Sequence, residues 1–204
     1  MNGAAHRAGS VMPAPAPTRL HRRSRPTLQA SNDPMLDADV VLLSDGSRVG
    51  IRPIRPGDRA ALATAFDRLS PQSRRNRFLV SKPRMSSAEL TYCTEVDHSS
   101  HEALVAFDVS GDRLLGVARY AGSPESPGAA ELALTVADDW QRRGLGTELA
   151  HRALASAQRN GIRRLRACSL ATNAAADRVL EALGFRRISS TGTTIDYELV
   201  IGYP

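Results

Sequence analysis

The amino-acid sequence predicts a mixed α/β domain in which a sheet packs against helices. Residues 144–160 show the apolar spacing of an amphipathic helix, and Gly161 supplies its stop signal. A strand pattern precedes this helix at 128–138, and another follows it at 164–171. Strands that precede and follow a helix in this way are typical of a mixed α/β sheet.

Local patterns predict the other elements. Asp45-Gly46 separates two short strand patterns, and the turn at 110–112 separates two more. Asn173 is a plausible helix cap, and Gly184 is a stop signal for that helix. In chain order we expect two strands within 40–55, helices at 56–70, 71–80 and 86–96, strands at 101–109, 112–122 and 128–138, the helix at 144–160, a strand at 164–171, a helix at 173–184, and a strand pair at 185–201 bent at Gly192.

The first part of the chain differs in composition from the rest. Residues 1–38 are rich in Pro, Ala, Ser and Arg and show no helical or strand period, so we expect a disordered basic tail before a domain at 39–204. This tail carries five arginines and two aspartates, within a net charge of +6 for the 204 residues. It has no aromatic residue to stack on bases, so a nucleic-acid partner is not expected. An over-long gene start is another interpretation of the segment.

Composition also limits location and metal binding. No apolar run approaches the ~20 residues that cross a membrane, and the N-terminus has no apolar stretch of the secretion-signal type. Cys93 and Cys168 do not have the spacing of a disulfide framework or a zinc site. We therefore expect a cytoplasmic protein with no membrane partner. His98 and His101 have no partner cysteine or acidic cluster, so we interpret them as loop or surface residues and expect no metal.

The start of the 144–160 helix has the composition of a phosphate site. A helix N-terminus leaves about four N–H groups without partners and carries roughly half a positive charge. Gly144 and Gly146 have no Cβ to keep a diphosphate away, and Arg142 and Arg143 add positive charge. A phosphate-bearing ligand at 141–147 is therefore predicted, and tight packing of the helix on a strand is the alternative.

Two common phosphate motifs are excluded. A Walker A loop needs Gly-Lys-Ser/Thr, but the one lysine, Lys82, lies between Ser81 and Pro83. A dinucleotide fingerprint needs a third glycine, and Leu149 stands there. We interpret Asp138 and Asp139, which precede the glycines, as solvated loop charges.

Two motifs resemble those of the GCN5-related N-acetyltransferases, the GNAT family. Gln141-Arg142-Arg143-Gly144-Leu145-Gly146 is similar to the family's Gln/Arg-x-x-Gly-x-Gly/Ala loop for the acyl-coenzyme A diphosphate. Residues 173–185, NAAADRVLEALGF, resemble the second family motif, with a strand between the two. The likeness covers roughly 48–201. Within it, RPIRPGD, LSPQSRRNRF and ADDWQRRGLG resemble in particular the catalytic domain of bacterial protein lysine acetyltransferases.

The resemblance implies a mixed, mostly antiparallel central sheet that is splayed in its middle and flanked by helices. It implies acetyl-CoA as the acyl donor, with the pantetheine arm lying in the gap like an added strand. The residues expected to bind it are Leu134, Thr135, Val136, Gln141, Arg142, Arg143, Gly144, Leu145, Gly146, Thr147 and Asn173. For Asn173 a simple helix cap is the alternative role.

Glu131 is the candidate general base. It alternates with Leu132 and Leu134 along the predicted strand, in a stretch with few other polar side chains, and partial burial there would raise its pKa. A glutamate at this position is the base in the acetyltransferases that the chain resembles, and a surface glutamate is the alternative. The family often places a tyrosine, as general acid, where this chain has Leu180.

These observations predict an N-acetyltransferase that transfers an acetyl group from acetyl-CoA to a primary amine by direct attack. The acceptor we expect is a protein lysine side chain. A small-molecule amine as acceptor, and an acyl-CoA-binding regulator with weakened catalysis, are the alternatives. A homo-oligomer stays open at this stage.

Overall fold

A computed structural model describes residues 33–123 and 125–202 of the chain. The predicted tail falls outside this part except for 33–38. Those last residues contact the domain, because Arg52 Nε donates a 2.7 Å hydrogen bond to the carbonyl oxygen of Pro34. Arg55 likewise donates to the carbonyl oxygen of Leu36 at 2.8 Å. Contacts with the domain therefore begin before residue 39.

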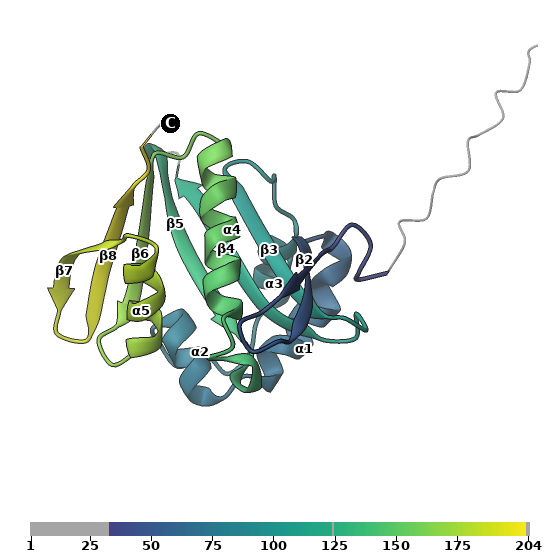
Figure 1. Cartoon of the computed structure of the whole chain (residues 1–204). Coiled ribbons are helices and arrows are strands. Elements are labelled where there is room, and N and C mark those ends of the chain that lie inside the picture. The colour runs from purple at the N-terminus through teal and green to yellow at the C-terminus, as the bar shows by residue number, and fades with distance from the viewer. Residues whose placement is uncertain (1–32, 124, 203–204) are drawn as a thin grey trace, which may run out of the picture. The chain divides into compact units, whose positions relative to one another are not determined.

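An eight-stranded sheet forms the centre of the described part (Figure 1). Its strand order is β1-β2-β3-β4-β5-β6-β8-β7, and every neighbouring pair is antiparallel except β5 and β6. The strands are β1 (Asp39–Leu42), β2 (Arg48–Pro53), β3 (His101–Asp108), β4 (Leu114–Ser123), β5 (Ser126–Val136), β6 (Arg164–Leu170), β7 (Arg186–Thr191) and β8 (Thr194–Val200).

Helices cover both faces of this sheet. In Figure 1, α4 crosses in front of β3, β4 and β5, while α1 and α3 lie behind them. The helices are α1 (Arg59–Arg68), α2 (Pro71–Phe78), α3 (Ser87–Thr94), α4 (Leu145–Arg159) and α5 (Ala174–Ala182), with single 3₁₀ turns η1 (Pro56–Asp58) and η2 (Asp138–Trp140). In the described residues, no helix has both the length and the apolar character to cross a membrane.

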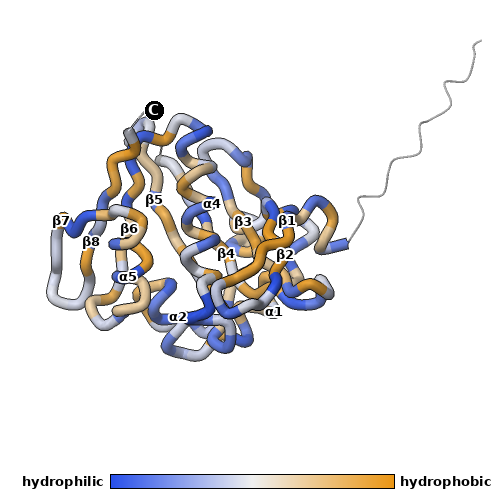
Figure 2. Tube along the Cα trace, in the orientation of Figure 1, coloured by the Kyte–Doolittle hydropathy of each residue, from blue (hydrophilic) through white to orange (hydrophobic). Residues whose placement is uncertain are grey.

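The apolar stripe of α4 explains its place on the sheet. Leu145 and Leu149 are fully buried, and they share one core cluster with Leu132 of β5. Figure 2 shows the alternation of polar and apolar residues along α4. A second core cluster lies on the opposite face, where Leu62 of α1 packs with Phe107 of β3. Burial of these side chains, worth about 1.5–3 kcal/mol each, fixes the two layers of helices.

The sheet opens between β5 and β6. Their parallel pairing is limited to 129–131 of β5 and 164–166 of β6. Beyond Glu131, β5 keeps its hydrogen bonds to β4, with Leu134 opposite Ala118 and Val136 opposite Gly116. The other edge of β5 is therefore unpaired from Leu132 onward. This confirms the predicted mixed, mostly antiparallel sheet with a splayed middle.

Candidate active site

The loop at 141–147 leads into the N-terminus of α4. Gly144 is the N-cap residue and adopts a φ of 88°, a left-handed conformation that favours glycine. The first main-chain hydrogen bond of α4 runs from Glu148 N to Gly144 O at 3.0 Å. The preceding N–H groups have no acceptor within the helix, so they are free to bind an anion.

A cavity of about 430 Å³ lies between this loop and α5, and we call it the loop cavity. It combines main-chain amides with three arginines, Arg77 from α2, Arg142 from the loop and Arg178 from α5. The predicted binding residues that line it are Leu134, Thr135, Val136, Gln141, Arg142, Gly144, Gly146, Thr147 and Asn173. The structure thus brings together all of the predicted binding residues except Arg143 and Leu145.

Arg143 and Leu145 lie outside the lining of the loop cavity. Leu145 is fully buried in the core under α4. The Arg143 guanidinium lies 4.9 Å from the centre of the Trp140 ring, and one of its nitrogens is 3.6 Å from a carboxylate oxygen of Asp45. Arg143 therefore faces the β1–β2 turn and does not line the loop cavity.

The two aspartates before the loop make side-chain contacts that the sequence did not predict. Asp138 and Asp139 are exposed, as expected, but both are bonded to other elements. Asp138 accepts hydrogen bonds from Ser70 Oγ at 2.8 Å and Ser73 Oγ at 2.6 Å. Asp139 accepts two bonds from the Arg113 guanidinium, and these lower the pKa of that carboxyl. The two charges are solvent-exposed, as expected, and they also connect the approach to the loop with Ser70, Ser73 and Arg113.

The loop cavity leads into the opening of the sheet. There a cavity of about 90 Å³, which we call the gap cavity, lies between β5, β6 and α5. Leu134 and Asn173 line both cavities. Asn173 Oδ1 also accepts the α5 cap bond from Ala176 N at 3.2 Å. The residue therefore serves as a cap, and it lines the two cavities at the same time.

Glu131 lies where the gap cavity meets two others. It lines an outer cavity of about 600 Å³, whose walls include Tyr92, Ile188 and Asp196. It also lines an inner cavity of about 240 Å³, on the side of the sheet where Phe78 and Cys93 lie. Glu131 itself is exposed, so the partial burial expected from the sequence is wrong. The strand turns this carboxylate away from the α4 core and toward open space.

Among the described residues, no tyrosine at the gap cavity takes the place of the one that the family often has where this chain has Leu180. Leu180 is buried and lines the gap cavity. Tyr120 donates to the carbonyl oxygen of Ser99, and Tyr197 donates to Asp177 at 2.5 Å. None of the residues described around the gap cavity is a tyrosine.

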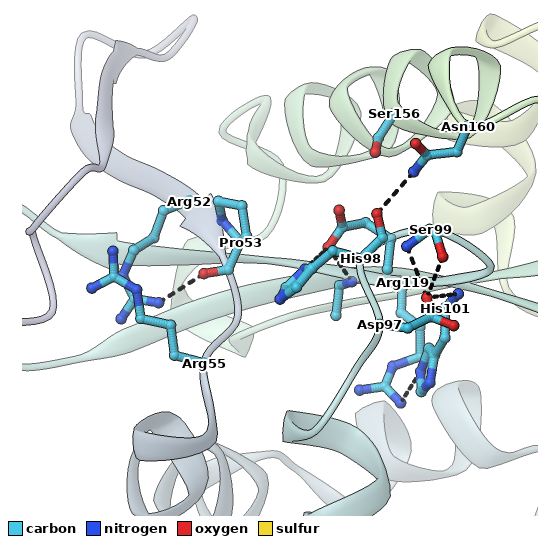
Figure 3. A network of polar contacts seen from close by, with 12 residues as sticks. Arg52, Pro53, Arg55, Asp97, His98, Ser99, His101, Arg119, Ser156 and Asn160 are labelled. Atoms are coloured by element: carbon cyan, nitrogen blue, oxygen red, sulfur yellow. Dashed lines mark hydrogen bonds and ion pairs between the residues drawn. The ribbon is translucent and has the colours of Figure 1, made fainter. Parts of the chain in front are cut away.

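The two histidines belong to a polar network (Figure 3), and Arg119 of this network also lines the inner cavity. His98 Nδ1 is 2.8 Å from the carboxylate of Glu102, which is buried. The ring of His101 lies 3.1 Å from an Arg119 nitrogen, and burial followed by the Arg119 charge lowers the pKa of His101. The described residues hold no group of three or more His, Cys, Asp or Glu that could bind a metal ion.

Sequence reasoning missed three residues around these cavities. Arg178 extends the loop cavity with positive charge, and its place within the second motif was the available signal. Cys168 lines the gap cavity, where burial and then Asp196 raise the pKa of its thiol to about 11. Arg77 lines the loop, gap and inner cavities, and nothing in its polar helix α2 marked it as a site residue.

Comparison with known proteins identifies the family. The protein-family model described as the acetyltransferase (GNAT) domain matches residues 48–186 of this chain. Acetyltransferase PA5475 of Pseudomonas aeruginosa is 37% identical over 145 residues, which cover 70% of this chain and 77% of that protein. Acetyltransferase Pat of Mycolicibacterium smegmatis is 31% identical over 167 residues, 81% of this chain and 48% of Pat. The chain therefore spans about half the length of Pat.

A solved structure agrees in fold. The GNAT domain of S. lividans PAT has a TM-score of 0.74 and 26% sequence identity, over 80% of this chain and 97% of that one. The family match at residues 48–186 includes the unpaired edge of β5, the loop at 141–147 and α5. The chain belongs to the GNAT family and is an acyl-CoA-dependent N-acetyltransferase with acetyl-CoA as its acyl donor.

Proposed function

We propose that the chain acetylates a protein lysine side chain, by direct attack of the amine on acetyl-CoA with Glu131 as general base. The observation that carries the proposal is that neighbouring cavities share lining residues. The loop cavity shares Leu134 and Asn173 with the gap cavity, and the gap cavity shares Glu131 with the outer cavity. A coenzyme and an acceptor could thus meet beside one carboxylate.

The coenzyme would be held mainly by the main chain. The N–H groups at 144–147 and the nearby Arg142 would bind its diphosphate. The unpaired edge of β5 at Leu134–Val136 offers main-chain groups to the pantetheine arm, as to an added strand. Arg143 is left out of this proposal because Asp45 and Trp140 hold its side chain elsewhere.

The outer cavity supports an amine acceptor. A lysine amine with a pKa of ~10.4 is almost wholly protonated at pH 7, and only its neutral form attacks. Glu131 and Asp196 outnumber Arg166, the one arginine that lines the outer cavity, and this excess of negative charge favours entry of an ammonium group. Removal of its proton by Glu131 would contribute roughly 10²–10⁴-fold to the rate.

The acceptor class is supported by the exposed rim. Tyr92 is 58% exposed and Ile188 is 54% exposed, and both line the outer cavity. Exposed side chains of this size suit contact with a protein surface around a protruding lysine. The resemblance to bacterial protein lysine acetyltransferases agrees with this. A small-molecule amine is the second candidate, because a volume of about 600 Å³ is also typical of small-ligand sites.

We further propose that 39–204 is the acetyltransferase domain and that the enzyme acts in the cytoplasm.

The functional test is to incubate the full chain with acetyl-CoA and three acceptors: an acetyl-CoA synthetase, whole lysate protein, and a panel of small amines. Release of free CoA and detection of acetyl-lysine identify the acceptor. Acetyl-lysine on protein supports the proposal. CoA release only with small amines would reject the protein acceptor.

A further inference from the structure

Arg77, the residue before the last of α2, lies where three cavities meet. It lines the loop cavity, the gap cavity and the inner cavity, and no other described residue lines all three. Glu131 shares the gap and inner cavities with it. Under the proposed function, the thioester of acetyl-CoA would lie at this junction, between the diphosphate end and the base.

The charge of Arg77 is not ion-paired, although the Glu131 carboxylate acts on it from beyond ion-pair distance. Within the described residues, its guanidinium makes no hydrogen bond or ion pair, and its one ring contact is with Phe78 at 5.0 Å. Neighbouring arginines are satisfied. Arg74 donates to main-chain carbonyl oxygens, and Arg119 donates to the carbonyl oxygen of Cys93 at 2.6 Å.

Partial burial of this unpaired cation has an electrostatic cost. Burial, and then the like charge of Arg119, lower the pKa of Arg77, yet a guanidinium stays protonated at neutral pH. Arg77 is half-buried, so part of the hydration of its charge is lost without a protein partner to replace it. An anionic group at the junction would provide that interaction, and acetyl transfer generates negative charge there, first on the carbonyl oxygen and then on the sulfur.

Proton donors for the leaving sulfur are poor. Leu180 stands where a tyrosine would act, and no described tyrosine lines the gap cavity. Cys168 does line it, but its thiol has a pKa of about 11 and is a weaker acid than an ordinary thiol at ~8.5. A thiolate derived from such an ordinary thiol can leave unprotonated if its charge is stabilised.

We propose that Arg77 is a catalytic residue that stabilises this charge, a role that rests on the acetyl transfer of the proposed function. After Glu131 has passed the ammonium proton to solvent, the neutral amine nitrogen forms a bond to the thioester carbon, and Glu131 accepts the second proton from this nitrogen. The carbon–sulfur bond then breaks, and its electron pair leaves with the CoA thiolate. Arg77 donates hydrogen bonds to the oxyanion and then to the thiolate, which later takes a proton from solvent.

The test compares Arg77→Gln and Arg77→Lys with Arg75→Gln, a control on the exposed side of α2. We measure acetyl-CoA affinity by calorimetry, kcat by CoA release, and the pKa of the thiol of bound CoA by its thiolate absorbance. Arg77→Gln should lower kcat on the order of 10²-fold, as loss of an oxyanion donor does, and change affinity by about threefold at most. The thiol of bound CoA should become about tenfold less acidic. Arg77→Lys should keep most of both properties.

The possible results distinguish failure of the proposed acetyl transfer from failure of the role proposed for Arg77. A wild-type chain that releases no CoA with any acceptor overturns the proposed function, and this inference with it. An active wild type whose kcat and bound thiol acidity are unchanged by Arg77→Gln overturns only the role of Arg77. A large loss of acetyl-CoA affinity with unchanged kcat also overturns it, because Arg77 would then be an anchor for the coenzyme. If Arg77→Gln does not fold, Arg77→Lys is the deciding variant. Retention of most of the kcat and of the thiol acidity in Arg77→Lys supports a role for the charge, and loss of the thiol acidity in that variant rejects it.

Discussion

Ser44 Oγ donates a 3.1 Å hydrogen bond to the carbonyl oxygen of Arg143, and so ties the β1–β2 turn to the loop that precedes α4. The same hydroxyl lies 2.9 Å from the position that a Cβ on Gly144 would occupy. The glycine is therefore required for two reasons, its φ of 88° and the close approach of Ser44. The conformation of the proposed diphosphate site depends on a contact with residues about a hundred positions earlier in the chain.

Gly144→Ala should weaken acetyl-CoA binding by roughly tenfold or more, because the new methyl group moves the loop and its N–H groups. Calorimetry with acetyl-CoA measures this loss. Gly192→Ala is the matched control, since Gly192 also has a positive φ, of 65°, but no atom within 4 Å of an added Cβ, and it lies in the β7–β8 turn. It should reduce stability without affecting affinity. In the double variant with Ser44→Ala, part of the lost affinity should return, and equal affinity for all variants would contradict the steric account.

Glu131→Gln should lower acetyl transfer by about tenfold or more, while acetyl-CoA affinity stays close to that of the wild type. The amide keeps the size of the side chain but cannot accept the amine proton. The measurement is initial CoA release at saturating acetyl-CoA. Glu181→Gln is the control, because that carboxylate is 54% exposed and pairs with Arg187 away from the cavities. Undiminished turnover of Glu131→Gln would remove Glu131 from the mechanism.

Asp97 should make the stability of the fold depend on acid pH. It accepts hydrogen bonds from the N–H of His101, the hydroxyl of Ser100 and the N–H of Ser99, and these lower its pKa (Figure 3). A carboxyl with a folded pKa below its unfolded value of ~3.9 stabilises the protein above that value. This stabilisation is lost as the pH falls through the folded pKa.

Thermal unfolding between pH 5 and pH 2 measures the effect. Asp97→Asn should have a lower Tm than the wild type at pH 5, and the difference should shrink as the pH falls. Asp112→Asn, at an exposed position of the β3–β4 turn, should follow the wild-type curve. A constant difference between Asp97→Asn and the wild type at every pH would show that the carboxylate charge is not the cause.

The local elements were predictable from sequence because their signals are local. The α4 stripe, the Asn173 cap and the turn at Asp45-Gly46 depend on residues a few positions apart, and the structure confirms all three. The loop at 141–147 was predictable for the same reason. The contact of Arg143 with Asp45 was not predictable, because Asp45 lies far away in the sequence.

The surroundings of β5 were harder to predict. An alternating strand pattern does not say whether its polar face is covered, and Glu131 proves to be exposed. Arg77 was missed because α2 has polar residues on every side, so periodicity does not distinguish its inner face. Only the packing of α2 beside the opening of the sheet shows which of its arginines lines the cavities.

The crystal structure of the full chain with acetyl-CoA tests the account most directly. We expect the diphosphate on the main-chain N–H groups at the start of α4, the pantetheine along the unpaired edge of β5, and the thioester beside Glu131 and Arg77. A coenzyme bound elsewhere, or one whose sulfur lies away from Glu131, would contradict the proposed site.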